Sequence, residues 1–353
     1  MTELNQEQQK IVEAKENYVL VASCAGSGKT RCLISRYQYL VNNGVAPEKI
    51  MMITFTNAAA DEISERLGRP KGVFIGTVHS YANYLLLSYN QDTTDLLENE
   101  QFDRLFERVK KHPNCVKEVE HLLLDEGQDS TELQFEFMFD MIKPKNWMVF
   151  ADWRQSLYRW NGAYPEQIIE LSHRADVKVY DLAGNYRNGY KILDFARGII
   201  SPAGYDYRDY SIPMRGVSGR VMDLEYSPVA IARTLKEKND YGKWFILTRT
   251  NDQIDEISRY LKIEGVPYDT FKRSALDNKE LGEKMKENTV KVLTIHTAKG
   301  LEADNVIVIG AKFFNVEERC VSYVAATRAR NLLVWTRMPT KAKKREFTSN
   351  WER

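Results

Sequence analysis

The sequence predicts an α/β fold with two parallel-sheet domains in tandem, and three observations favour it. Short apolar runs rich in β-branched residues alternate with amphipathic stretches, a pattern typical of parallel strands joined by helical crossovers. These runs fall into two sets along the chain. The length of 353 residues is enough for about two ordinary domains, each with its own core. We therefore expect a first domain over residues 1–180 and a second over residues 181–353.

The first domain is expected to contain six strands and a small helical insertion. An amphipathic stretch at Asn57–Leu67 predicts a helix between the second and third strands. From His79 to His121 the sequence is polar and helical, so residues 81–120 are expected to form the insertion. The six strands are predicted at Tyr18–Ser23, Lys49–Thr56, Val73–Val78, His121–Asp125, Trp147–Asp152 and Val177–Leu182.

The second domain is expected to contain a further set of strands. Two prolines and three glycines within Ser201–Gly219 predict an irregular surface loop before this set. The strands are predicted at Arg220–Tyr226, Lys243–Thr248, Val290–Ile295, Val306–Ile309 and Leu332–Trp335.

The composition argues against several classes of protein. The four cysteines form no CxxC pair and have no histidine at metal-ligand spacing, which argues against a zinc site or a disulfide framework. The sequence has neither a secretory leader pattern nor a run of about 18 apolar residues, so we expect a cytoplasmic protein. The formal net charge is +1, so a polyanion would have to bind a local basic patch.

Residues 19–30, VLVASCAGSGKT, have the pattern of a phosphate-binding loop between a strand and a helix. Glycines let backbone N–H groups curl around a phosphate, and the helix N-terminus adds its positive end. Lys29 would contribute a positive charge, and Thr30 a hydroxyl for Mg²⁺. Ser23 stands where the strict GxxxxGK pattern has its first glycine. A Gly-rich turn without a ligand is the alternative, but the flanking strand and helix favour the phosphate loop.

A phosphate loop needs a carboxylate for the metal and a group that activates water, and both are expected at the end of another strand. The segment HLLLDEGQD supplies them, with Asp125 as the Mg²⁺ ligand and Glu126 as the group that polarises water. Two acids after a strand are also common in a solvated turn or a helix cap. The presence of Lys29 upstream favours the catalytic interpretation.

The strand NWMVFAD is followed by WRQSLYRWNGA, which adds an amide and two aromatic rings. Gln155 is a candidate contact to a terminal phosphate. Tyr158 and Trp160 flank Arg159, and interleaved aromatics and arginine suit stacking on unpaired bases. The same rings could fill a core, and the sequence leaves both interpretations open.

In order and spacing, these segments resemble the motifs of superfamily 1 helicases of the UvrD, Rep and PcrA type, and the likeness runs from Leu4 to Arg330. The resemblance implies two RecA-like cores with ATP and Mg²⁺ in the cleft between them. It also implies that hydrolysis drives 3′ to 5′ movement along single-stranded DNA or the tail of a partial duplex.

The resemblance assigns nucleotide-site roles to residues of both domains. LNQEQ resembles the family's Q motif, AGSGKT its Walker A motif, DEGQD its Walker B motif and NYR its motif IV. The implied catalytic residues are Lys29, Glu126, Gln155, Arg187 and Arg328. The implied nucleotide-binding residues are Gln8, Ala25, Gly26, Ser27, Gly28, Lys29, Thr30, Arg31, Arg36, Tyr186 and Glu302, with Thr30 and Asp125 for the metal.

Other segments resemble the family's DNA-contacting motifs: TFTN at residues 54–57, GTVHS at 76–80, QSLYRWNGA at 155–163 and TIHTAKGLE at 294–302. Judged singly, each histidine of this set is more typical of a polar residue near a strand end, and Phe55 of a core residue. The implied DNA contacts are Phe55, Asn57, Thr77, His79, Tyr158, Trp160 and His296.

Two departures from the family pattern bear on function. Asn161 stands where the family usually has an arginine, which weakens the expected link between hydrolysis and the grip on DNA. The family usually carries two accessory domains, whereas here we expect the first to be reduced and the second to be missing. The alternative function is therefore an ATP-gated DNA-binding or assembly module with weak unwinding. A P-loop kinase of a small metabolite is disfavoured because it would leave without a role the segments TIHTAKGLE and VAATRAR (residues 324–330), which resemble the family's motifs V and VI.

Overall fold

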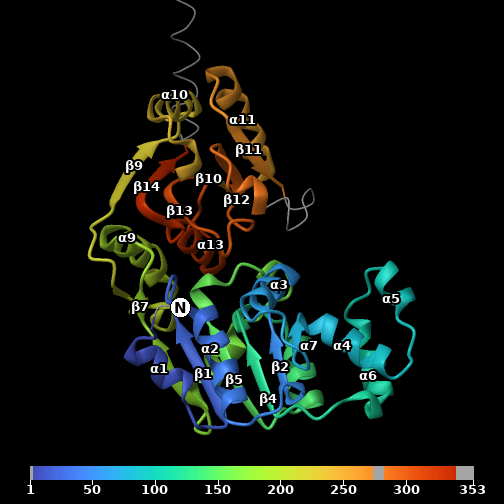
Figure 1. Cartoon of the computed structure of the whole chain (residues 1–353). Helices are drawn as coiled ribbons and strands as arrows, with labels where there is room; N and C mark the ends of the chain where they lie inside the picture. Colours follow the sequence, from blue (N-terminus) through green and yellow to red (C-terminus); the bar gives the residue numbers. More distant parts are fainter. Residues whose placement is uncertain (1–2, 273–281, 339–353) are drawn as a thin grey trace, which may run out of the picture. The chain divides into compact units, whose positions relative to one another are not determined.

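The computed structural model describes residues 3–272 and 282–338 (Figure 1). The chain divides into two compact units, residues 1–184 and residues 185–353. Each unit has a six-stranded sheet in which all strand pairs are parallel. The predicted α/β fold with two parallel-sheet cores is thus confirmed. The division follows Gly184, just past the residue 180 expected from the sequence.

The sheet of the first unit has the strand order β3-β2-β4-β5-β1-β6. Its strands are β1 (Tyr18–Ser23), β2 (Ile50–Ile53), β3 (Phe74–Gly76), β4 (His121–Leu124), β5 (Asn146–Ala151) and β6 (Lys178–Leu182). Because β5 lies between β1 and β4, the segments that follow these three strands leave the sheet side by side at one edge.

Helices cover both faces of this sheet, as a parallel sheet requires. The helices are α1 (Gln6–Val12), α2 (Lys29–Asn42), α3 (Asn57–Arg66), α4 (Val78–Ser88), α5 (Thr94–Glu98), α6 (Arg104–Lys111), α7 (Glu132–Phe135) and α8 (Glu166–His173). In β1, Val19 and Val21 pack against α1 and α2, whereas Leu20 belongs to the core formed with α4 and α6. The alternation along one strand therefore builds two separate cores.

Between β3 and β4 the chain forms α4, α5 and α6, and this part of the described chain contains no strand. Thr77 and Ser80 form a capping box at the start of α4, which fixes where the helix begins. Leu105, Phe106 and Val109 of α6 are buried in the core shared with the sheet. The short helices are thus anchored on the first unit (Figure 1).

The sheet of the second unit has the order β11-β12-β10-β13-β14-β9. Its strands are β9 (Arg220–Glu225), β10 (Trp244–Thr248), β11 (Tyr268–Phe271), β12 (Val290–Thr294), β13 (Ala303–Ile309) and β14 (Ala329–Arg337). Its helices are α9 (Tyr190–Ile200), α10 (Pro228–Lys238), α11 (Asn251–Glu264) and α13 (Val316–Ala326). Residues Ile231, Ile254 and Ile257 of α10 and α11 pack on Ile246 of β10 in one core.

Three features of the second unit differ from the strands and loop expected from the sequence. The strand β11 was not predicted because it is short and half polar. β13 begins at Ala303 rather than Val306, and β14 extends on both sides of the predicted run. Within the expected loop, Ile212–Pro213 (β8) pairs with Gly184–Asn185 (β7). No helix in the described ranges is long and apolar enough to cross a membrane.

Candidate functional site

The loop after β1 turns at two glycines before α2 begins. Gly26 and Gly28 have positive φ angles of 65° and 87°, which glycine adopts without steric strain. Ser27 Oγ donates to the carbonyl of Cys24 (2.8 Å), and Ser23 Oγ donates to Ala151 O of β5 (2.8 Å). The first N–H groups of α2 then face the loop, because a helix leaves its first donors without intrahelical partners. This arrangement can bind a phosphate chain.

The two acids after β4 contact the first two residues of α2. Thr30 Oγ1 lies 3.4 Å from Asp125 Oδ2, and Lys29 Nζ lies 3.4 Å from Glu126 Oε1. Burial, followed by the charge of Glu126, raises the pKa of Asp125 above its ordinary range, and Lys29 opposes this shift. The structure thus brings together the predicted phosphate-binding and acidic residues of the first unit.

Thr30 and Asp125 fit the chemistry of Mg²⁺, which prefers hard oxygen ligands. Magnesium usually takes one or two carboxylates from a protein and completes its shell with water and phosphate oxygens. The described part of the chain contains no group of three or more His, Cys, Asp or Glu side chains able to hold a metal ion. A cation held by Thr30 and Asp125 would have further coordination positions for water or phosphate oxygens.

A hydrogen-bond network connects Glu126 to the end of β5. Gln128 Nε2 donates to Glu126 Oε2, and Gln128 Oε1 accepts from the backbone N–H of Asp152 (3.0 Å). Asp152 Oδ2 in turn accepts from Gln155 Nε2 (2.6 Å). Arg154 pairs with Asp152 (2.6 Å) and donates to Ser23 O (2.6 Å), which returns the network to β1.

Three residues of this network were not among the predicted site residues, namely Gln128, Asp152 and Arg154. The signal that could have revealed them is their position, because each follows a strand that ends beside the phosphate loop. Their role is to hold the side chains of Glu126 and Gln155 in place relative to the loop.

Two residues predicted to bind nucleotide also have structural contacts. Gln8 Nε2 donates to Ser27 O of the phosphate loop (3.3 Å), and Gln8 forms a capping box with Asn5. Arg36 is buried, and its NH1 donates to Val12 O (2.8 Å) and Ala14 O (2.7 Å). These contacts fasten the end of α1 to α2. A role for Arg36 at the base stays a prediction.

The predicted DNA contacts of the first unit lie near the ends of β2, β3 and β5. Phe55 and Tyr158 stack with ring centroids 4.5 Å apart, and Trp160 lies 6.5 Å from Tyr158 with 54% of its surface exposed. Asn57 is the first residue of α3, and Thr77 caps α4. The aromatic residues thus form a cluster in which Trp160 reaches solvent.

Two residues of the helical insertion contact His79. Its Nε2 lies 3.0 Å from Asp103 Oδ1, and its ring stacks on Phe106 with centroids 4.9 Å apart. A small cavity connects this region to the acid pair, since its lining includes Phe55, Thr77, His79, Asp125 and Glu126. The two acids and three of the predicted DNA contacts therefore line one cavity of the first unit.

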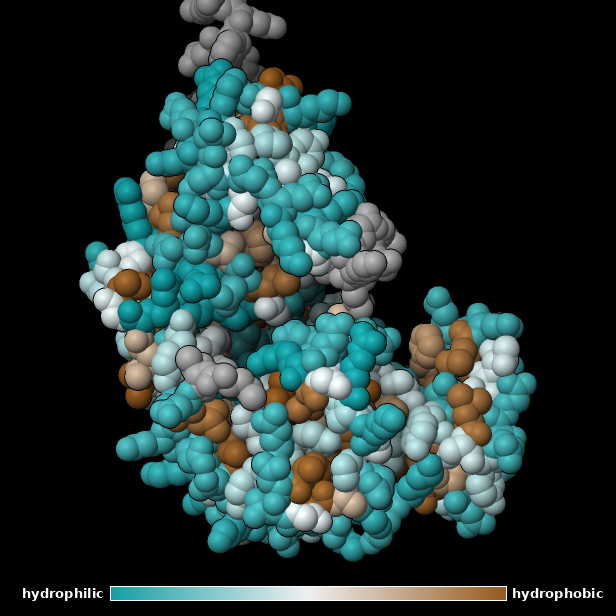
Figure 2. All heavy atoms as spheres, viewed as in Figure 1, coloured by the Kyte–Doolittle hydropathy of each residue, from teal (hydrophilic) through white to brown (hydrophobic). Residues whose placement is uncertain are grey.

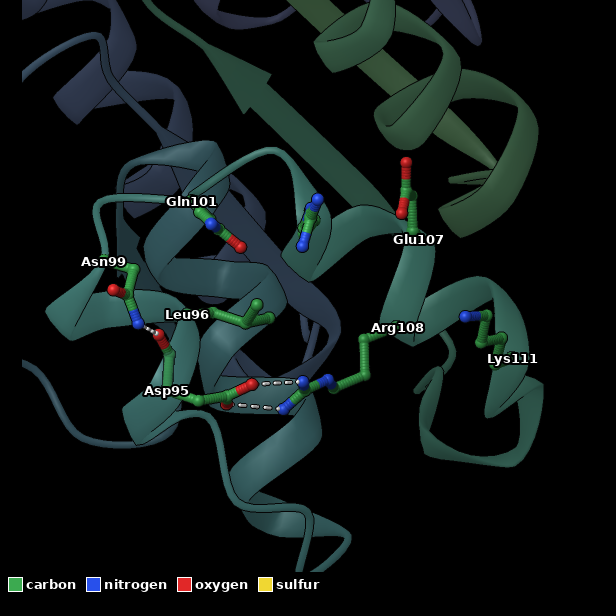
Figure 3. A pocket seen from close by; sticks show the side chains of 8 residues that line it. Asp95, Leu96, Asn99, Gln101, Glu107, Arg108 and Lys111 are labelled. Atoms are coloured by element: carbon green, nitrogen blue, oxygen red, sulfur yellow. Dashed lines mark hydrogen bonds and ion pairs between the residues drawn. The ribbon is translucent and has the colours of Figure 1, made fainter.

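A larger cavity of about 350 Å³ lies in the helical insertion, and none of its lining residues is a predicted site residue (Figure 3). Arg108 crosses it to form a bidentate pair with Asp95, at 3.0 and 2.8 Å. The other lining residues are Leu96, Asn99, Gln101, Arg104, Glu107 and Lys111. This cavity is separate from the site that the motifs define.

In the second unit, three separate segments meet where β13 and β14 begin. Glu302 pairs with Arg187 and with Arg330 NH1 (3.0 Å). Burial alone would raise the pKa of Glu302, but Arg187, Arg330 and Arg328 together hold it below its ordinary value. Asn188 fixes the assembly, because its Nδ2 donates to Thr327 O (3.1 Å) and Ala329 O (2.6 Å).

Arg328 is held at this end of the second sheet by backbone carbonyls. Its Nε donates to Val324 O (3.1 Å) and its NH1 to Leu301 O (3.3 Å). Tyr186 is 42% exposed and precedes Arg187 in the sequence, and His296 follows shortly after the end of β12. The structure therefore brings Arg187, Glu302 and Arg328 together. That they share a triphosphate with Lys29 stays a prediction.

Comparison with known proteins agrees with the geometry of both units. Residues 4–111 and 100–176 match the model of the UvrD/REP helicase N-terminal domain, and residues 269–339 match that of the UvrD-like helicase C-terminal domain. A protein named probable DNA helicase from Mycoplasma pneumoniae is 23% identical, over 94% of this chain and 83% of its own length.

Two further relatives are longer than this chain. The ATP-dependent DNA helicase Rep of Escherichia coli is 25% identical over 75% of this chain and 54% of its own length. The Gabija protein GajB of Bacillus cereus is 25% identical over 73% of this chain and 62% of its own length. The matched region thus spans about half to five-sixths of these three relatives.

Proposed function

The chain belongs to the UvrD/Rep type of superfamily 1 helicases, and we propose that it is an ATP-dependent single-stranded DNA translocase and DNA helicase. The observation that carries the proposal is the contact of Lys29 and Thr30 with Glu126 and Asp125 at the edge of a parallel sheet. This is the set of groups that phosphoryl transfer from a nucleoside triphosphate requires.

In the proposed reaction, the loop 24–28 and the start of α2 bind the phosphates. Lys29 exchanges its contact with Glu126 for the phosphate oxygens, which leaves the Glu126 carboxylate to orient and polarise the attacking water. Thr30 and Asp125 would hold Mg²⁺, which neutralises phosphate charge when bound. Gln155, fixed by Asp152, contacts the terminal phosphate.

The second unit supplies the remaining nucleotide contacts in this proposal. Arg187 and Arg328 stabilise the charge that develops on the terminal phosphate. To reach it, Arg187 exchanges the Glu302 carboxylate, and Arg328 a backbone carbonyl, for phosphate oxygens. Tyr186 stacks on the adenine and Glu302 contacts the ribose. In this proposal, closure of the two cores on each other depends on the bound nucleotide, because charges from both units would meet on one ligand.

Single-stranded DNA is the proposed track, alone or as the tail of a partial duplex. Phe55, Tyr158 and Trp160 would stack on bases, with Asn57, Thr77, His79 and His296 as polar contacts. His79 must break its contact with Asp103 before it can bind DNA, since the two side chains form a pair in the structure. Each cycle of closing and opening would then move the strand in the 3′ to 5′ direction.

The test combines hydrolysis with strand displacement. We expect ATPase activity to rise manyfold with oligodeoxythymidine and to be abolished by Lys29→Ala. A duplex with a 3′ tail should be opened, and its 5′-tailed counterpart should not. ATP-dependent DNA binding without stimulated hydrolysis would overturn the motor and support the alternative, an ATP-gated binding or assembly module.

A further inference from the structure

The loop between α9 and β9 is hydrogen-bonded to the segment that carries Arg187. Met214 N donates to Asn185 O (2.8 Å), at the pairing of β8 with β7. Further along the two segments, Tyr190 N at the start of α9 donates to Val217 O (3.1 Å). The last part of the loop therefore runs alongside the residues on both sides of Arg187.

This loop is fixed at both of its ends. A Cβ atom on Gly189 would lie 2.5 Å from Gly219 N, which is closer than any side chain tolerates, so only glycine allows the two backbones to approach in this way. Nearer the start of the loop, Tyr323 Oη of α13 donates to Asp209 Oδ2 (3.0 Å). The stretch that was expected to be an irregular surface loop is thus held in one conformation.

Arg215 extends from this loop to two backbone carbonyls. Its NH1 donates to Arg187 O (2.8 Å) and to Arg330 O (2.7 Å), and its NH2 donates to Asn331 Oδ1 (3.0 Å). All three acceptors are neutral oxygens, and the planar fork of a guanidinium can bind several of them at once. The half-buried Arg215 thus joins the chain at Arg187 to the start of β14.

The backbone of Arg187 is held on both sides by these contacts. Its N–H donates to Asn185 Oδ1 (3.0 Å), and its C=O accepts from Arg215. With both groups engaged, the peptide units before and after the residue are fixed. The Arg187 side chain, which pairs with Glu302 in the structure, therefore extends from a fixed point that Arg215 helps to set.

Arg215 also fixes the Arg187 segment relative to Arg328. Its second carbonyl partner, Arg330 O, lies two residues beyond Arg328 in the sequence. In the proposed reaction Arg187 and Arg328 contact the same terminal phosphate, so the spacing of their two segments decides whether both side chains reach it. A misplacement of about 1 Å in such a group can cost about 100-fold in rate.

We infer that Arg215 is a positioning residue for ATP hydrolysis, which holds the backbone of Arg187 against the start of β14 and so places the Arg187 side chain for the terminal phosphate. Its hydrogen bonds are to the chain itself, so it acts through Arg187. The inference rests on the proposed function, in which Arg187 stabilises charge on that phosphate. It adds to that function a residue outside the segments that resemble the family's motifs.

The test measures steady-state hydrolysis by the full chain with saturating oligodeoxythymidine. We expect Arg215→Ala to lower kcat about 10- to 100-fold with KM for ATP almost unchanged, because Arg187 is misplaced whereas the phosphate loop is intact. Arg215→Lys should remain impaired, since one ammonium group cannot replace the planar fork on two carbonyls and an amide.

A double variant separates positioning from general damage to the fold. Arg187→Ala alone should lower kcat by about 10³-fold or more. Arg215→Ala added to Arg187→Ala should lower kcat little further, because the effects of residues that act as a unit are not additive. Arg220→Ala is the matched control, since Arg220 is exposed at the first residue of β9, and it should leave kcat unchanged. Thermal unfolding of each variant gives its Tm.

The outcomes separate this inference from the proposed function. Normal kcat in Arg215→Ala, with hydrolysis lost in Arg187→Ala, would overturn the inference and leave the motor standing. The inference would also fall if Arg215→Ala reduced kcat by the same factor with and without Arg187, or if Arg215→Lys were fully active, because charge alone would then suffice. Normal hydrolysis in Arg187→Ala would overturn the proposed role of Arg187 and the inference with it.

Discussion

Asp125 and Glu126 follow the same strand, but their surroundings suit them to different tasks. Asp125 is 5% exposed and faces Thr30, so a cation at this position would compensate the cost of its buried charge. Glu126 has a φ of 53°, which turns its side chain toward Lys29 and Gln128. A non-glycine residue held in this conformation is commonly a functional one. The backbone turn thus directs the two adjacent carboxylates to different partners, as the roles that we propose for them require.

Glu126→Gln is expected to lower the ATPase kcat at least about 100-fold, because a positioned general base contributes about that factor or more. ATP binding should persist, since Lys29 and the loop backbone remain. Phosphate release and binding of a fluorescent ATP analogue measure the two properties separately. Hydrolysis near the unaltered rate would remove Glu126 from the proposed role.

Gln128→Ala tests a residue that acts through others. Its loss breaks the connection from Glu126 to Asp152 and leaves polar groups without partners, which costs about 1–3 kcal/mol in a buried setting. We expect kcat to fall about 10- to 100-fold with KM for ATP almost unchanged. A rise in KM with kcat preserved would mean that Gln128 serves binding rather than positioning.

Among the secondary-structure elements, burial explains what could be predicted from the sequence. Strands such as β1 and β10 are continuous apolar runs because helices cover both faces of a parallel sheet, and they were found almost to the residue. The strand β11 reads YDTF and was missed, since half of it is polar and it lies at the edge of its sheet. β13 starts three polar or small residues earlier than its apolar run, because sheet pairing continues beyond the core.

In the candidate site, too, some features could be predicted from the sequence and others could not. Lys29, Thr30, Asp125 and Glu126 were predictable because local spacing fixes both the chemistry and the strand end that carries it. The pairing of His79 with Asp103 was not predictable, because it depends on how α6 packs against α4. Tertiary contacts between distant segments leave no periodic signal in a single sequence.

The junction of α1 and α2 yields a prediction about stability. Arg36→Ala removes two hydrogen bonds from a buried guanidinium to the carbonyls of Val12 and Ala14. Since bonds to charged groups contribute about 1.5–3 kcal/mol each, we expect a loss of about 3 kcal/mol, which corresponds to a Tm lower by about 6–12 °C. Thermal unfolding followed by circular dichroism measures this shift.

The control for Arg36 is Arg66→Ala in α3. Arg66 is exposed, and among the residues that the structure describes it pairs only with Glu62 four residues earlier (3.3 Å), so its loss should change stability by less than about 0.5 kcal/mol. If Arg36→Ala instead raises KM for ATP while Tm is unchanged, Arg36 acts at the nucleotide as the family resemblance implies.

For the whole molecule, the decisive question is whether both units act on one nucleotide. The first unit holds the Thr30–Asp125 and Lys29–Glu126 contacts, to which we assign the metal ion and the attacking water. The second holds Arg187, Glu302 and Arg328 close together where β13 and β14 begin, and the hydrogen bonds of Asn188 to the backbone fix this arrangement. Neither set is complete for a motor, because coupling requires a charge that reaches the phosphate only when the cores close.

Arg328→Ala therefore tests most directly whether the second unit contributes to ATP hydrolysis at the site of the first unit. An arginine supplied to a terminal phosphate contributes about 10³- to 10⁵-fold in kcat, so we expect a loss of at least about 10³-fold with ATP binding retained. Arg330→Ala is the matched control, because Arg330 pairs with Glu302 (3.0 Å) two residues further along the same segment. That variant should keep most of its hydrolysis, since Arg187 still holds Glu302. Steady-state hydrolysis with saturating oligodeoxythymidine measures both variants, and equal activity in Arg328→Ala and the unaltered chain would mean that the first unit hydrolyses ATP without the second.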